Sequence, residues 1–334
     1  MDNIGATVFT KKNVLRTLAA LLAFAVIVVG LVIAANLYEK HFGNFDGNAQ
    51  GNVGGKKTVE YNGQTYVFKS SIETFLLVGL DAFGQAVEND SYNNDRQADL
   101  LMLFILDREN KTCHAVHINR DTMTEVTILG VTGQKVGTTE QQIALSHTYG
   151  NGGIDSCRNV ATAVSHLMCG VSIDNYLSLT MDGIMKLNDL VGGVTLTAIG
   201  DFSGVDDSIV EGREITLLGE HALNYVRSRH DGPNEKRMER QRQYMNALYL
   251  QSVNYVNGNA DISADVIANL NEYAVTSCDA ADVSDMLEKL VEYDFVEIRT
   301  IQGTSEIGEK YMEFNCDAEA LKALVVELCC TPQN

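Results

Sequence analysis

Two near-continuous apolar runs of strand length lie close together in this sequence, TFLLVGL at 74–80 and DLLMLFIL at 99–106. A strand with one solvated face alternates apolar and polar side chains, whereas a strand covered on both faces is apolar throughout. The two runs therefore predict central strands of a sheet that has helices on both sides. HAVHI at 114–118 follows the turn DRENK and is expected to be the hairpin neighbour of the second run.

The rest of the chain alternates between helical and strand patterns, with no internal repeat. Asn62-Gly63 at the centre of 58–68 favours a hairpin, and Asp182 is expected to cap the helix that it begins. Further strands are expected at 175–181, 194–199 and 295–301, and helices at 139–149, 154–169, 182–193, 217–226, 236–256, 263–273, 280–292 and 317–330. This order predicts one α/β domain of three layers, in which a central mixed sheet lies between helices.

The N-terminal part departs from this pattern, because residues 17–38 carry no charge. A helix of that length would cross a bilayer, and the basic residues before it place the N-terminus in the cytoplasm. A cleaved signal peptide is the alternative, although its apolar core is usually shorter. We expect a cytoplasmic tail at 1–16, one transmembrane helix at 17–38, a flexible Gly- and Asn-rich stalk at 39–57 and an extracytoplasmic catalytic domain at 58–330.

The charge of the chain excludes a general affinity for polyanions. The 334 residues carry a formal net charge of -19, from 25 basic and 44 acidic side chains. A body this acidic is repelled by nucleic acid and by anionic lipid headgroups. No nucleic-acid partner is therefore expected, and a local cluster of basic residues indicates a specific anion site.

Seven cysteines lie beyond the predicted anchor, and no two of them form a C-x-x-C motif. Zinc-ribbon and thioredoxin-like chemistry are therefore disfavoured. We interpret most of these cysteines as small buried hydrophobes, with a disulfide framework as the alternative.

One short segment, YVRSRHDGPNEKRMERQRQ at 225–243, holds five of the twelve arginines. Arg227 and Arg229 are expected on one side of an extended stretch, and Arg237, Arg240 and Gln241 on one face of the helix that follows. Guanidinium groups match phosphate oxygens two at a time, so the segment predicts a phosphate site. A lattice of salt bridges with neighbouring acidic residues is the alternative.

A second set of charged residues lies at predicted strand ends. Asp81 follows the first apolar run, Arg96 and Asp99 precede or begin the second, and Arg120 and Asp121 follow 114–118. If the outer two strands run parallel with 99–106 antiparallel between them, these residues meet at one edge of the sheet. Asp81 and Asp99 are then suitable ligands for Mg²⁺, which prefers one or two carboxylates together with phosphate oxygens.

These motifs resemble the LytR-CpsA-Psr family. LLVGLD, RQADLLMLFI, INRDT, GGVTL and LLGEHALNYVRSR followed by RMERQRQ occur in the order of that family, over roughly residues 72–330. The resemblance implies an α/β/α domain that binds a polyprenyl pyrophosphate in the membrane and transfers its anionic glycopolymer, such as teichoic acid or capsular polysaccharide, to peptidoglycan. It also implies a groove for the prenyl tail, formed where the two central strands and a covering helix part.

The resemblance assigns roles residue by residue. Asp81 and Asp99 are expected to bind Mg²⁺, and either Asp99 or Asp121 to accept a proton from the attacking hydroxyl group. The residues expected to contact the pyrophosphate or to position its ligands are Arg96, Arg120, Arg227, Arg229, Arg237, Arg240 and Gln241. Three departures from the family pattern bear on the site. Asn119 stands where a proline is usual, and Arg96 and Asp99 are separated by two residues where one is common. Glu235 replaces an aspartate that usually precedes the first helical arginine.

Two other functions use the same residues. A prenyl-phosphate binding protein would hold the ligand without turnover, and attack by water would make the site a pyrophosphatase. A cytoplasmic transcription regulator is disfavoured by the acidic charge and by the lack of a helix-turn-helix pattern.

Overall fold

A computed structural model of the chain describes residues 58–89, 92–230, 232–258, 271–278, 282, 293–309 and 311–333. The predicted tail, anchor and stalk lie outside the described residues, as does most of the two helices predicted at 263–273 and 280–292. Within the described ranges, no helix is both long enough and apolar enough to span a bilayer.

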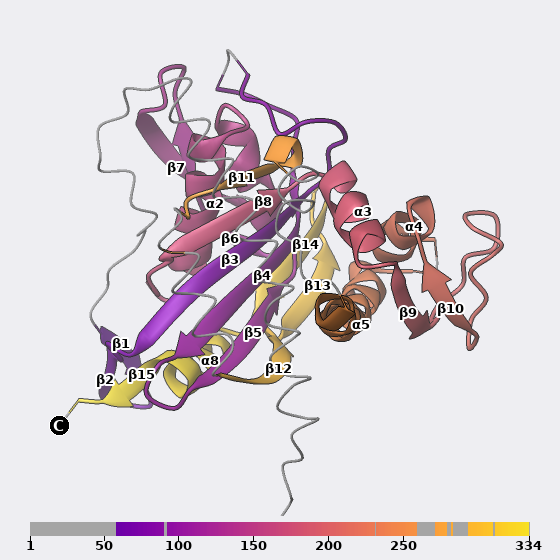
Figure 1. Ribbon diagram of the computed structural model, residues 1–334. Coiled ribbons are helices and arrows are strands. Elements are labelled where there is room, and N and C mark those ends of the chain that lie inside the picture. Colours follow the sequence, from indigo (N-terminus) through magenta and orange to yellow (C-terminus); the bar gives the residue numbers. More distant parts are fainter. Residues whose placement is uncertain are drawn as a thin grey trace, which may run out of the picture.

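A six-stranded mixed sheet forms the centre of the domain, in the order β11-β8-β3-β4-β5-β12 (Figure 1). β4 is antiparallel to both β3 and β5, so β3 and β5 run parallel to each other, as predicted. β8 and β12 extend the sheet as parallel partners of β3 and β5, and β11 is antiparallel to β8. The strands are β3 (Ile72–Leu80), β4 (Ala98–Asp107), β5 (Thr112–Ile118), β8 (Asn175–Leu179), β11 (Ala274–Thr276) and β12 (Asp294–Thr300).

Helices cover both faces of this sheet, which confirms the predicted three layers (Figure 1). Alternate residues of β4 pack in opposite directions. Met102 and Leu106 belong to the core under α3, α4 and α5, whereas Leu101 and Leu103 belong to the core under α2 and α8. The helices are α2 (Ile154–Leu167), α3 (Met181–Leu190), α4 (Glu220–Arg227), α5 (Asn234–Gly258) and α8 (Ala318–Cys329).

Smaller sheets surround the central one. The predicted hairpin at 58–68 is confirmed, and its turn residues Asn62 and Gly63 have φ angles of 50° and 72°. The hairpin β13–β14 lies against the end of β5, through a hydrogen bond of 2.9 Å from the Phe314 amide to the Asp121 carbonyl. These strands are β1 (Thr58–Tyr61), β2 (Gln64–Phe68), β6 (Met123–Leu129), β7 (Lys135–Gln142), β9 (Val194–Thr197), β10 (Glu214–Leu217), β13 (Gly303–Ile307), β14 (Met312–Cys316) and β15 (Cys330–Pro332).

Three local predictions were wrong. The helix predicted at 139–149 begins inside β7, which pairs with β6, and only the 3-10 helix η1 (Ile143–Tyr149) follows. Asp182 does not cap α3: Thr180 precedes that helix, and the Asp182 carboxylate instead accepts a hydrogen bond of 2.6 Å from the Gly84 amide. Arg227 is the last residue of α4, so it does not share an extended stretch with Arg229.

All seven cysteines are free thiols, and five of them are buried. The prediction that most are small buried hydrophobes is confirmed. Burial raises the pKa of the Cys113 thiol to about 12, and the pKa of Cys316 to about 11.

Two buried histidines predict acid sensitivity. Burial, and then the charges of Arg242 and Arg237, lower the pKa of His117 to about 3, and burial lowers the pKa of His147 to about 4. In the unfolded chain both histidines have the ordinary pKa of 6.5, so below that pH they bind more protons than in the folded protein. The free energy of unfolding should therefore decrease as the pH falls from about 6.5 toward 4, by up to about 1.4 kcal/mol per pH unit for each histidine.

Urea unfolding at a series of pH values measures this slope. Replacing both histidines by glutamine should flatten it, whereas the same change at the more exposed His166 should leave it unaltered. An unfolding free energy that stays constant over this range would contradict the prediction.

Candidate active site

A β-bulge places Asp99 at the edge of the sheet. Gly79 of β3 is opposite Leu100 of β4, but Leu80 is opposite Ala98, so Asp99 has no partner residue on β3. A bulge interrupts the alternation of side chains and re-aims the extra residue. As a result Asp99 and Leu100, although consecutive, both line the same pocket.

Two arginines from different elements bind the two oxygens of Asp99. Arg120, which follows β5, donates through Nη1 to Oδ1. Arg237, in the N-terminal part of α5, donates through Nη1 to Oδ2 at 2.9 Å. Asp99 is buried and Arg237 is only 2% exposed, so this contact joins the sheet edge to α5 in the interior. The predicted meeting of Asp99, Arg120 and the arginine segment is confirmed.

The buried guanidinium of Arg237 has unused donors. Its Nε and Nη2 atoms have no hydrogen-bond partner among the described residues. Burial, and then the positive charges of Arg229 and Arg120, lower the pKa of Arg237 to about 9. A buried cation with free donors and cationic neighbours is electrostatically under-compensated. This group is therefore suited to bind an anion.

A second ion pair lies further out. Arg227 donates through Nη2 to Asp81 Oδ1 at 3.1 Å, and both side chains are more than a third exposed. The Arg227 guanidinium also lies 5.5 Å from the centre of the Phe83 ring. Arg229 is exposed, and its charge acts on both Arg120 and Arg237. Asp81 and Arg229 thus lie close enough to act on the two arginines that bind Asp99, and Arg227 lines the same pocket as Asp99.

Asp121 is a buried orienting group. Its Oδ1 accepts hydrogen bonds from Arg120 Nε at 3.3 Å and from Gln142 Nε2 at 3.0 Å. Its amide donates to Asn119 Oδ1 at 3.0 Å, and the same oxygen accepts from Asn234 Nδ2 at 2.6 Å. Asn119, where the family usually has proline, therefore fastens the turn that carries Arg120 to the start of α5.

Three of the predicted pyrophosphate ligands have main-chain partners. Arg240 donates to the carbonyls of Tyr225, at 3.0 Å, and of Ser228, which fixes the end of α4. Gln241 Nε2 donates to the Val226 carbonyl at 3.1 Å, and its buried Oε1 has no partner among the described residues. Arg96 donates to the carbonyls of Val87 and Gly152, away from Asp99. The predicted contacts of Arg96 and Arg240 with the pyrophosphate remain predictions.

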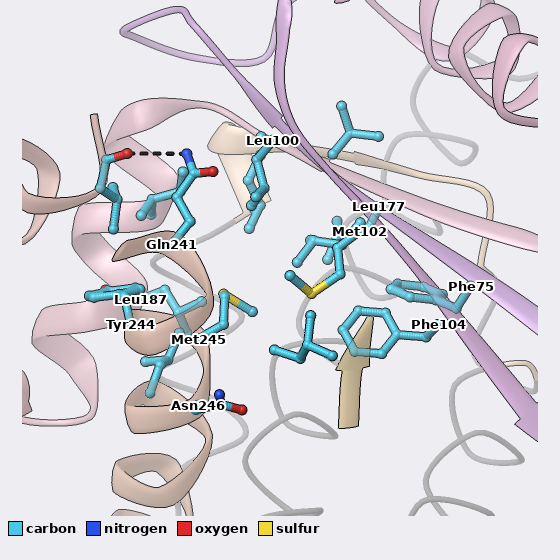
Figure 2. A pocket seen from close by; sticks show the side chains of 18 of the residues that line it. Phe75, Leu100, Met102, Phe104, Leu177, Leu187, Gln241, Tyr244, Met245 and Asn246 are labelled. Carbon is cyan, nitrogen blue, oxygen red and sulfur yellow. Dashed lines mark hydrogen bonds between the residues drawn. The ribbon is translucent and has the colours of Figure 1, made fainter. Parts of the chain in front are cut away.

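An apolar pocket opens beside this cluster, between one face of the sheet and helices α3 and α5 (Figure 2). Asp99, Arg227, Arg237 and Gln241 contribute to its lining, which is otherwise almost entirely apolar. The pocket has a volume of about 1640 Å³, including the open space at its mouth. The side chains labelled in Figure 2 are Phe75, Leu100, Met102, Phe104, Leu177, Leu187, Gln241, Tyr244, Met245 and Asn246.

The predicted apolar groove is present, between the central strands and the covering helices α3 and α5. β3 and β4 stay hydrogen-bonded along the pocket, and the space lies between them and the helices. Sequence reasoning missed the polar residues that support the cluster, Gln97, Asn234 and Gln142. Nothing in the sequence pattern distinguishes them from surface residues.

Asp81 and Asp99 are the two carboxylates that the sequence predicts as ligands of a divalent cation. The described residues contain no group of three or more His, Cys, Asp or Glu side chains that could hold a metal. Mg²⁺, however, needs only one or two carboxylates when phosphate oxygens complete its shell. Both carboxylates are paired with arginines. When a phosphorylated ligand binds, these arginines can donate to its phosphate oxygens in place of the carboxylates. The donor set therefore fits Mg²⁺ together with a phosphorylated ligand.

Comparison with known proteins agrees with the motifs. The sequence matches the model of the LytR_cpsA_psr family over residues 44–328. The chain belongs to this family.

Curated relatives include transferases named polyisoprenyl-teichoic acid–peptidoglycan teichoic acid transferase TagU. The protein of that name from a Bacillus cereus strain is 31% identical over 184 residues, which are 54% of this chain and 53% of the relative. The one from Bacillus licheniformis is 28% identical over 246 residues, 73% of this chain and 72% of the relative. The chain thus spans about half the length of the first of these relatives.

Solved structures of the same fold include "TagT bound to LIIa-WTA", with a TM-score of 0.58 and 18% identity over 82% of this chain and 95% of that chain. Bacillus subtilis TagV has a TM-score of 0.57 and 22% identity, over 78% of this chain and 97% of that chain. At this identity the likeness concerns the fold, and it confirms the LytR-CpsA-Psr-like α/β architecture.

Proposed function

We propose that this protein is a phosphotransferase that moves an anionic glycopolymer from a polyprenyl pyrophosphate carrier to peptidoglycan. The observation that carries the proposal is the apolar pocket that opens beside the buried, under-compensated guanidinium of Arg237. A ligand that joins a long apolar chain to a polyanion matches both parts of this site. The names of the TagU relatives point to the same class of reaction.

The arginines bind and orient the pyrophosphate in this proposal. Arg237 has two free donors, and Arg120 and Arg229 add charge beside it. These cations stabilise the negative charge that develops on the bridging oxygen as the prenyl phosphate leaves. The pocket holds the prenyl chain and keeps the bond to be broken beside the arginines.

The transfer step joins an acceptor hydroxyl oxygen to the phosphorus that bears the glycopolymer. The bond from that phosphorus to the bridging oxygen breaks, and prenyl phosphate is released. Both aspartates are bonded to Arg120, but Asp99 lines the pocket, whereas Asp121 is not among the lining residues and is also bonded to Gln142. We therefore assign the hydroxyl proton to Asp99 and an orienting role to Asp121.

Mg²⁺ is proposed as the cofactor, held by Asp81 and Asp99. When bound, it supplies positive charge that neutralises pyrophosphate oxygens. Residues 17–38 are proposed as the membrane anchor, with the catalytic domain outside the cell, where peptidoglycan lies.

Binding and product formation test this function together. The full chain in detergent is titrated with farnesyl pyrophosphate, in Mg²⁺ or in EDTA, and phosphate products are followed. We expect binding that weakens at least tenfold in EDTA and about tenfold in Arg227→Ala, because Arg227 contributes a partly exposed charge.

The outcomes separate the candidate functions. A phosphorylated acceptor and farnesyl phosphate, formed only with Mg²⁺ and a muropeptide acceptor, support phosphoryl transfer, whereas equal release of farnesyl phosphate without acceptor identifies a pyrophosphatase. Binding without product in every condition identifies a prenyl-phosphate binding protein. If wild-type protein does not bind farnesyl pyrophosphate, the arginines form a salt-bridge lattice and the proposed function is wrong.

A further inference from the structure

Gln97 contacts both Asp81, which follows β3, and Arg120, which follows β5. Its Oε1 accepts a hydrogen bond of 2.7 Å from Arg120 Nη2, and its carbonyl accepts one of 2.9 Å from the Asp81 amide. A single residue thus bonds to the aspartate that follows β3 and to the arginine that follows β5.

Arg96, the preceding residue, is directed elsewhere. Its Nη1 donates to the carbonyls of Val87, at 2.8 Å, and Gly152, at 3.3 Å, and its own carbonyl contacts His147 Nδ1 at 2.9 Å. A Cβ atom at Gly152 would lie 3.0 Å from Arg96 Nη1, so the glycine leaves room for the guanidinium. Through these contacts Arg96 connects the segment that precedes β4 to the start of α2.

The two side chains separate because consecutive residues of an extended chain point to opposite sides. Gln97 is directed to Arg120, and Arg96 is directed to the start of α2. Ala98 is buried in the core under α2 and α8, whereas Asp99 lines the pocket on the opposite face. The spacing of Arg96 and Asp99 in this sequence therefore turns an amide, and not a guanidinium, toward Arg120.

We propose that Gln97 is a positioning residue for Arg120. Every nitrogen of the Arg120 guanidinium has a partner: Asp121 at Nε, Asp99 at Nη1 and Gln97 at Nη2. The amide oxygen fixes the plane of the guanidinium and adds no negative charge. A carboxylate at this position would compensate the charge that the pyrophosphate needs, and an arginine would repel Arg120.

This inference rests on the proposed function, and a double-mutant cycle tests it. Gln97→Ala should weaken farnesyl pyrophosphate binding about tenfold or more, the effect of one hydrogen bond to a charged group. In an Arg120→Ala background the same change should have little further effect, because the guanidinium that it positions is absent. Gln97→Glu should also weaken binding, although it retains the acceptor oxygen.

Two variants serve as comparisons. Gln85 lies in the same loop and is hydrogen-bonded to Glu272 at 2.8 Å, so Gln85→Ala should leave the affinity unchanged. Arg96→Ala should lower Tm, with a smaller loss of affinity than Gln97→Ala, because it releases the loop from α2.

The inference fails if the losses from Gln97→Ala and Arg120→Ala are additive, since Gln97 would then act independently of Arg120. It also fails if Arg96→Ala loses more affinity than Gln97→Ala. Both results leave wild-type binding intact, so they would not contradict the proposed function. Absence of wild-type binding would refute the inference and the proposed function together.

Discussion

Replacing Arg237 by alanine is expected to weaken binding of farnesyl pyrophosphate by about 100-fold or more. Its Nε and Nη2 are buried donors without partners among the described residues. Each charge-assisted hydrogen bond contributes roughly 1.5–3 kcal/mol, so losing two of them costs about 3 kcal/mol at the least. Isothermal titration calorimetry of the full chain measures the change, and transfer activity should fall in proportion.

Two further substitutions define the cause. Arg237→Lys keeps the charge but loses the planar fork, so most of the affinity should still be lost. Lys236→Ala removes a positive charge at the preceding position, where the side chain is exposed, and should change the affinity less than twofold at physiological salt. If Arg237→Ala binds farnesyl pyrophosphate as tightly as wild type, the buried guanidinium is not the anion site.

The central layer could be predicted because its strands are covered on both faces. Two apolar runs and the shorter HAVHI segment predict β3, β4 and β5, and the short turn at 107–111 makes β4 and β5 antiparallel. The long connection at 81–97 does not fix the direction of β3, so its parallel arrangement with β5 was a condition of the prediction, and the structure meets that condition. With these directions, Asp81, Asp99 and Arg120 lie at one edge of the sheet.

The arginine segment shows where that reasoning stops. The spacing of Arg237, Arg240 and Gln241 correctly predicts one face of α5, but it does not show which acceptors lie opposite that face. The last turn of α4 presents free carbonyls, which α-helices leave unsatisfied at their C-terminal ends. Arg240 and Gln241 donate to these carbonyls, so Arg237 alone of the three reaches Asp99.

The bulge at Asp99 was also beyond sequence reasoning. It depends on the register between β3 and β4, and an apolar run on both faces carries no alternation to fix that register. The same limit applies at 139–142, where pairing with β6 makes the segment a strand although its own sequence looked helical. Both differences arise from partners distant in the sequence.

Filling the apolar pocket is expected to weaken binding of the prenyl chain and to leave binding of the pyrophosphate unchanged. Met245 of α5 lines the pocket opposite Met102, and its side chain is only partly buried (Figure 2). Met245→Trp should exclude part of the prenyl chain. Each methylene group kept out of the pocket costs about 0.8 kcal/mol, so the loss of three carbons weakens farnesyl pyrophosphate binding about 50-fold. Affinity for inorganic pyrophosphate, which has no prenyl chain, should stay within about twofold of wild type.

A bulky residue outside the pocket provides the matched control. Val136 of β7 is 60% exposed, so Val136→Trp adds a large apolar side chain without touching the pocket and should leave both affinities unchanged. Competition binding with the two ligands measures the contrast. Equal losses for farnesyl and inorganic pyrophosphate in Met245→Trp would mean that the substitution disturbs α5 and the Arg237 contact. No loss for either would mean that the prenyl chain lies elsewhere. Only a loss confined to the prenylated ligand assigns the apolar chain to this pocket and the pyrophosphate to the arginines at its mouth.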